Sequence, residues 1–219
     1  MPRTITVKGS GKAAAKPDYA VLSITLEAKN MDYEAAMDQA GTQLEQLKTS
    51  LTEAGFERDA VKTANFNVRT EYRHTQDERG NYRNEFDGYV VSHALKLSFD
   101  LDTERLNRAL STIASSLSNP QLNIVFSVKD SASVNDALLQ SAAENARKRA
   151  DVLCAASGVK LGALLSIDYT WGERGIFSRS AFDMSAESMP LMARAKAPDI
   201  LPEDIDYEDE ATFVWEIQD

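Results

Sequence analysis

The chain has 219 residues, of which 43% are hydrophobic and 26% are charged, and this composition excludes collagen-like, low-complexity and mostly disordered classes. Its 24 Lys and Arg residues stand against 34 Asp and Glu residues, so the formal net charge is −10. An acidic surface repels phosphate backbones and anionic lipid headgroups, so we do not expect nucleic acid as a partner.

The compartment is judged from the cysteine and from the N-terminal segment. Cys154 is the single cysteine, so no intrachain disulfide can form, which fits a reducing compartment. The segment 1–7 lacks the apolar stretch of a signal peptide, and the longest uncharged run, 109–128, is too polar for a transmembrane helix. We therefore expect a cytoplasmic protein, or an envelope or periplasmic one if a leader was removed before Met1.

The first half of the chain predicts strands around one helix. Residues 4–8 indicate a short strand that Gly9-Ser-Gly11 would end in a turn, and residues 20–28 alternate as a half-buried antiparallel strand. Apolar spacings of three and four then predict a helix between an N-cap at Asp32 and a C-terminal cap at Gly55. Residues 66–72 and 89–99 predict a hairpin with a long polar tip, turning at 77–80.

The second half repeats this pattern. A helix begins at Asp102 or Thr103 and ends at Asn119-Pro120, and a strand follows at 122–128. The capping-box variant Ser133-x-x-Asp136 predicts the start of a helix that runs to Gly158. The last two strands are expected at 165–171 and 211–217. We predict an α+β fold, a single domain over 1–219 with one antiparallel sheet and about three helices on one of its faces.

An insertion at 172–207 is too long for an ordinary connection. It holds an apolar set that follows neither a helix nor a strand period, and its methionines suit adaptable contacts. Three alternatives are open: the segment folds back over its own sheet, it forms a subunit contact, or 176–192 closes as a lid over a ligand. The candidate interaction residues are Ile176, Phe177, Phe182, Met184, Met189, Leu191 and Met192.

Motifs for catalysis and for cofactor binding do not emerge. The sequence Gly9-Ser-Gly11-Lys12-Ala13 has neither the spacing nor the Ser or Thr of a phosphate-binding loop. His74 and His93 lack metal-ligand spacing, and no Gly-x-Ser-x-Gly elbow presents a serine. We interpret His93 as a partly buried strand residue, Cys154 as a small buried hydrophobe, and the acidic run 203–210 as a solvated flank. We assign no catalytic, cofactor-binding or metal residue.

The order of several short motifs resembles the SIMPL domain family, also called DUF541. The motifs are Ile5-Thr-Val-Lys-Gly9-Ser-Gly11, Pro17-Asp18-Tyr-Ala20, Ala54-Gly55-Phe56, Val61-Lys-Thr63, Gly88-Tyr89, Asn123-Ile124-Val125-Phe126-Ser127, Ala143-Glu-Asn-Ala146-Arg-Lys-Arg-Ala150 and Gly158-Val-Lys-Leu161-Gly162. The resemblance spans residues 4–217. It implies an α+β fold, export to the bacterial envelope in many members and large homo-oligomers in some. It implies no catalytic residues.

From these observations we expect a non-enzymatic, self-associating protein with a stress- or envelope-related role. The alternative is a binding module for a small apolar ligand or an extended peptide, with 176–192 as its lid.

Overall fold

The computed structural model describes residues 3–76, 82–116, 120–169, 176–184 and 201–219. The chain forms two compact units: unit 1 comprises 1–18, 127–179 and 202–219, and unit 2 comprises 19–126 and 180–201. The single domain expected from the sequence stays a prediction. The elements are β1 (Thr4–Ala15), β2 (Tyr19–Asn30), α1 (Tyr33–Glu53), η1 (Arg58–Ala60), β3 (Val61–Gln76), β4 (Tyr82–Asp100), α2 (Thr103–Ser116), β5 (Gln121–Ser127), α3 (Ser131–Ala156), β6 (Lys160–Asp168), β7 (Phe177–Met184) and β8 (Ile205–Gln218).

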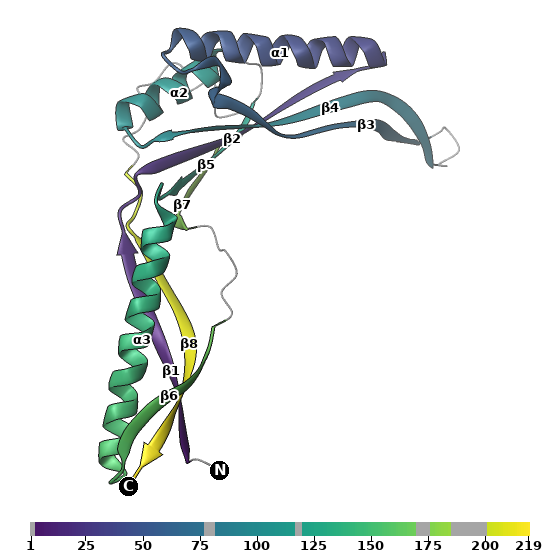
Figure 1. The fold of residues 1–219 in the computed structure, drawn as a ribbon. Coiled ribbons are helices and arrows are strands. Elements are labelled where there is room, and N and C mark those ends of the chain that lie inside the picture. The colour runs from purple at the N-terminus through teal and green to yellow at the C-terminus, as the bar shows by residue number, and fades with distance from the viewer. Residues whose placement is uncertain (1–2, 77–81, 117–119, 170–175, 185–200) are drawn as a thin grey trace. The chain divides into compact units, whose positions relative to one another are not determined.

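Unit 2 is built on a sheet of five strands in the order β3-β4-β2-β5-β7. Strand β4 lies between β2 and β3 and is antiparallel to both. The chain order β2-α1-β3-β4-α2-β5 is that of the split β-α-β motif. Helices α1 and α2 lie over the same face of this sheet (Figure 1).

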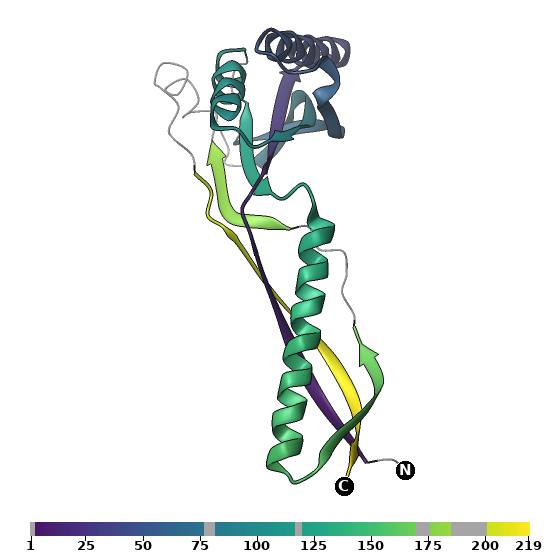
Figure 2. The same cartoon turned by 60° about the vertical axis from the view of Figure 1, so that its left-hand side comes forward.

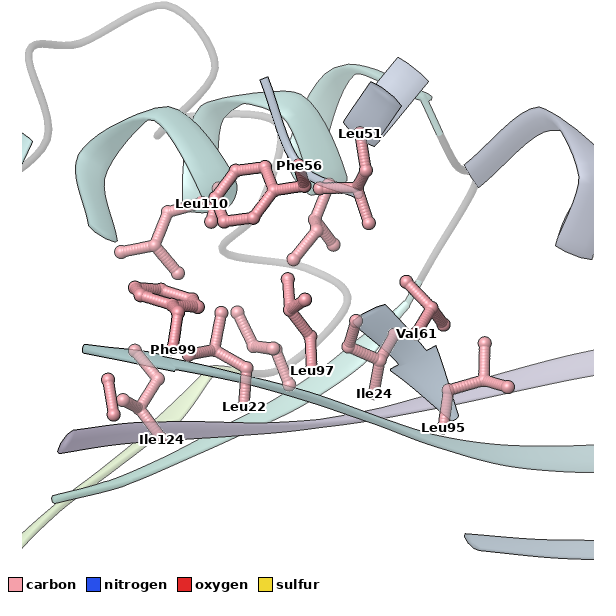
Figure 3. Close-up of a cluster of buried hydrophobic side chains, with 14 of the residues drawn as sticks. Leu22, Ile24, Leu51, Phe56, Val61, Leu95, Leu97, Phe99, Leu110 and Ile124 are labelled. Atoms are coloured by element: carbon pink, nitrogen blue, oxygen red, sulfur yellow. The ribbon is translucent and has the colours of Figure 1, made fainter. Parts of the chain in front are cut away.

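The core of unit 2 lies between that sheet face and the two helices, as Figure 3 shows. Alternate residues of β2, among them Leu22 and Ile24, are fully buried, which confirms the half-buried strand predicted from the alternation. Helix α1 begins after Asp32, whose carboxylate accepts a hydrogen bond from the Ala35 amide at 2.9 Å, and ends before Gly55, whose φ is 91°. Both predicted caps of this helix are confirmed.

Unit 1 is a three-stranded antiparallel sheet, ordered β1-β8-β6, with α3 along one face (Figure 2). Its core joins Phe213 and Trp215 of β8, whose rings stack at 5.5 Å, to a row of fully buried alanines on α3. Alanine has the smallest side chain that still counts as apolar surface, so the helix axis can approach the sheet closely. The alanines are Ala142, Ala146 and Ala150.

Two glycines of β1 explain this close approach and correct an expectation. Gly9 and Gly11 lie inside β1, so the turn predicted there is wrong. A Cβ on Gly9 would lie 2.1 Å from the carbonyl oxygen of Ala142, and one on Gly11 would lie 2.2 Å from that of Leu138. The strand continues through both glycines because the backbone of α3 occupies the space that a side chain would need.

The fold class is confirmed, whereas the number of sheets and one helix cap differ from the predictions. The α+β class and three α-helices are confirmed, but the described strands form two sheets instead of one, because α3 packs on a different sheet from α1 and α2. Helix α3 begins at Asp130, whose carboxylate accepts from the Ser133 amide at 3.0 Å, so the predicted cap at Ser133 is wrong. Asp102 caps α2 at the Arg105 amide, as expected. Asn119, Trp171 and the hairpin turn 77–80 lie outside the described residues.

Candidate functional site

The predicted interaction residues occupy different environments. Ile176 is 1% exposed and packs with Val128 and Ile205 in a small core of unit 1. The backbone of 177–184 forms β7, a strand that the sequence pattern does not reveal. Phe177 is about half exposed, while Phe182 makes an edge contact with Phe126 at 6.0 Å between ring centroids. Met184 ends β7, and Met189, Leu191 and Met192 lie outside the described residues.

The histidine and cysteine interpretations are confirmed. His93 is 7% exposed in β4, and its Nε2 lies 2.9 Å from the Thr63 hydroxyl. Burial lowers the pKa of His93, and the positive charge of Lys48 lowers it further. Cys154 is buried in α3. Within the described ranges no three His, Cys, Asp or Glu side chains converge as a metal site would require.

The acidic run at the start of β8 borders a cavity of about 810 Å³ in unit 1, lined also by Lys12 and Phe177. Within the acidic run, Glu208 accepts a hydrogen bond from the Ser10 hydroxyl at 2.8 Å. It also forms an ion pair with Lys12 at 3.3 Å. These two donors hold the pKa of Glu208 below its usual range, and the hydrogen bond from Ser10 is the largest single cause. This part of the run is therefore paired across the β1–β8 ladder as well as solvated.

Polar side chains of α3 bond to the outer edge of β1 between Lys8 and Lys12. The Ser10 amide donates to the Asn145 side chain at 3.2 Å, and the Lys12 amide donates to the Ser141 hydroxyl at 3.1 Å. Arg149 donates to the Lys8 carbonyl at 3.0 Å. The three donors and acceptors on α3 recur every four residues, so one row of the helix runs along the strand. The backbone groups bonded in this way, the amides of Ser10 and Lys12 and the carbonyl of Lys8, are not free to pair with another strand.

No other described strand pairs with the opposite edge of this sheet, which is formed by β6. Strand β6 pairs with β8 alone in the described part of the chain, and every residue from Ala163 to Asp168 is exposed. The exposed side chains on this strand and just after it include four large apolar or aromatic ones: Leu164 at 47%, Leu165 at 49%, Ile167 at 54% and Tyr169 at 42%. An exposed apolar edge strand is a template for pairing with another chain. We call residues 160–168 the β6 edge.

The β3–β4 hairpin carries a second exposed feature, a row of aromatic rings. Tyr72, Phe86, Tyr89 and Tyr33 follow one another in edge contacts of 5.2 to 5.9 Å between ring centroids. Beside this row, Lys29 bonds to Asp87 at 2.6 Å and to Glu71 at 2.8 Å. The hydrogen bond from Lys29 lowers the pKa of Asp87. The pKa of Lys29 is raised by its two carboxylate partners, with the larger effect from Asp87 and the smaller from Glu71.

Sequence reasoning placed a strand at 165–171 but did not identify it as an exposed edge. A signal was present, because Leu164-Leu165 breaks the apolar and polar alternation and puts leucine on both faces of one short strand. Such a strand is typically either buried on both faces or open to a partner. Only the position of β6 as the end strand of the β1-β8-β6 sheet selects the second case.

None of the helices in the described ranges is both long enough and apolar enough to cross a membrane. No curated protein sequence matches the chain significantly. The SIMPL family model, described as a protein of unknown function (DUF541), matches residues 5–215, which is nearly the whole chain. The match includes both units, the glycines of β1 and the β6 edge. The protein therefore belongs to the SIMPL (DUF541) family.

Proposed function

We propose that this SIMPL protein is a non-enzymatic, self-associating protein. The observation that carries the proposal is the β6 edge, where three apolar side chains about half exposed lie on the end strand of the described sheet. Burying such side chains against a second chain removes apolar area from water, which favours association by roughly 25 cal/mol for each Å². The strand also offers backbone hydrogen bonds that a partner strand can complete.

The net charge of −10 works against association at low salt, because two copies repel one another. Salt screens this repulsion over about 10 Å at 0.1 M and leaves apolar burial intact. We therefore expect a defined multimer that persists or strengthens as salt rises. The native mass of the untagged chain, measured by light scattering at low and high salt over a range of concentrations, tests this. A monomer under all these conditions contradicts the proposal.

Binding of an extended peptide is the second candidate function, because an open strand edge accepts a peptide by strand addition. The lid version of this alternative needs 176–192 to move, but Ile176 is packed in a core and its carbonyl accepts a 2.6 Å hydrogen bond from Ser127. A thermal-shift screen of peptides and small apolar compounds separates the two functions, since a ligand raises the melting temperature of the monomer.

The stress- or envelope-related role is the physiological part of the proposal and is carried by family membership alone. Fractionation of cells that express the native gene tests it. Recovery of the protein in the envelope or periplasmic fraction supports that role, and recovery in the cytoplasm alone contradicts its envelope part.

A further inference from the structure

We infer that the partner at the β6 edge is the β6 edge of a second copy of this chain, paired antiparallel about a two-fold axis at Leu164. This inference rests on the proposed self-association and names its interface. The pairing joins two three-stranded sheets into one continuous sheet with β6 strands at its centre. On the other edge of each sheet, polar side chains of α3 already bond to backbone groups of β1 from Lys8 to Lys12. A two-fold contact that uses the same surface of both copies closes as a pair.

The charges at the ends of β6 are complementary for this register. In an antiparallel pair centred on Leu164, Lys160 of each copy stands opposite Asp168 of the other. Both side chains are exposed, and neither has an ion-pair partner in the described part of the chain. Opposite charges directly across a strand pair stabilise it, whereas like charges destabilise it. A parallel pair would place Lys160 opposite Lys160 and Asp168 opposite Asp168, so the charges also select the antiparallel direction.

The apolar residues of β6 match the same axis. Three of them stand opposite those alternate residues of β8 whose side chains point toward α3, so they share that face of the sheet. They are Leu161, Leu164 and Ile167, which pair with Ile217, Trp215 and Phe213. In the proposed pair, Leu161 meets Ile167 of the second copy, and Leu164 meets its own equivalent. Three apolar contacts therefore form in a row on one face, while the charged ends lie on the other.

The irregularities in β6 are symmetric about the same residue. Against β8, the strand gains one extra residue between Leu161 and Leu164 and another between Leu164 and Ser166, so Leu161 and Ile167 are each displaced by one residue relative to Leu164. Bulges usually disturb edge pairing because they change which face a side chain occupies. Here the changes are equal on the two sides of Leu164, so a two-fold pair keeps its apolar residues on the same face. A register moved by one residue would instead place Lys160 opposite Ile167.

The test uses charge reversals in the full-length chain. Lys160→Asp and Asp168→Lys each turn two attractive pairs of the dimer into two repulsive ones. We expect each variant alone to raise the dimer dissociation constant about thirtyfold, as cross-strand pair energies imply. An equimolar mixture of the two variants restores complementarity at both ends, and so does the double exchange K160D/D168K. Lys148→Asp, which makes the same charge change on the exposed face of α3, is the matched control and is expected to leave the constant unchanged.

Sedimentation of each variant and of the mixture gives the result, with circular dichroism showing that each variant is folded. Weakened single variants and a restored mixture support the inference. If the wild-type chain forms multimers and the reversals leave its mass unchanged, or if neither the mixture nor the double exchange restores it, this interface is wrong while the proposed self-association stands. If the wild-type chain is monomeric throughout, the proposed function fails and this inference fails with it.

Discussion

The packing of β1 against α3 gives a sharp test of how unit 1 is held together. In a Gly9→Ala variant the new Cβ would lie 2.1 Å from the Ala142 carbonyl oxygen and 2.7 Å from the Ala146 methyl carbon. Ordinary contacts of this kind are 3.4 Å or longer, so strand and helix must separate by more than 1 Å at this point. Neither neighbour can rotate away, because one is backbone and the other is a single methyl group.

Gly9→Ala should reduce the stability of unit 1 in two ways. Overpacking a tight interior typically costs about 1–3 kcal/mol. Separation of the two elements also weakens the hydrogen bonds from the Ser10 and Lys12 amides to α3, each worth about 1 kcal/mol. We therefore expect Gly9→Ala to lower the free energy of unfolding of unit 1 by about 3 kcal/mol. This sum combines the cost of overpacking with a partial loss of both hydrogen bonds.

Urea unfolding measures this change. A Trp171→Phe background leaves Trp215, which is 3% exposed in the core of unit 1, as the fluorescent reporter. Gly41→Ala, in α1 of unit 2, is the matched control, because nothing beyond its own helix lies within 4 Å of the new Cβ and alanine favours the helix by roughly 0.5–1 kcal/mol. A Gly9→Ala variant as stable as the wild-type chain would refute the close-packing argument.

Three further predictions concern a cap and two titrating groups. Asp130→Ala removes the N-cap of α3 and should lower the free energy of unfolding in urea by about 0.5–2 kcal/mol, whereas Asp136→Ala should lower it much less. If Asp136→Ala proved the more costly, the capping box predicted at Ser133 would be supported instead. The pKa of His93 is lowered in the folded state, so the unfolded chain binds the proton more readily, and stability present above pH 6.5 is lost as pH falls from there toward the folded pKa. His93→Gln should flatten that slope, and an unchanged slope would show that another group causes it. Lys29→Met should raise the pKa of Asp87 in a carboxyl NMR titration, because the bond that lowers it is removed; an unmoved titration would contradict the ion pair.

Local patterns were sufficient for the elements that carry their own signals. The alternation in 20–28, the spacing of apolar residues in α1 and the cap at Asp32 are properties of consecutive residues, and the structure confirms each of them. The same holds for His93, since a histidine between alternating apolar residues of one strand faces the same core as they do. The α+β class follows from such elements taken together.

The wrong predictions concern residues whose structure depends on segments far away in the chain. Gly9-Ser-Gly11 reads as a turn in isolation, and it is strand only because α3, more than 120 residues later, presses its backbone against it. Strand β7 was hidden inside an apolar segment without period, since its alternation is weak and its place beside β5 comes from the sheet. Likewise, one sheet was expected where the described strands form two, because a strand's sequence shows which of its faces is apolar but not which helix will cover that face.

The candidate site divides in the same way. The sequence by itself determined the charges at Lys160 and Asp168 and the apolar residues between them, which are the chemistry of the β6 edge. Only the tertiary structure decided that this chemistry is exposed, because α3 bonds to the edge of β1 at Ser10 and Lys12, and no described strand pairs with the free edge of β6. The physical reason is that exposure of a strand depends on what packs beside it, which is a relation between segments far apart in the chain.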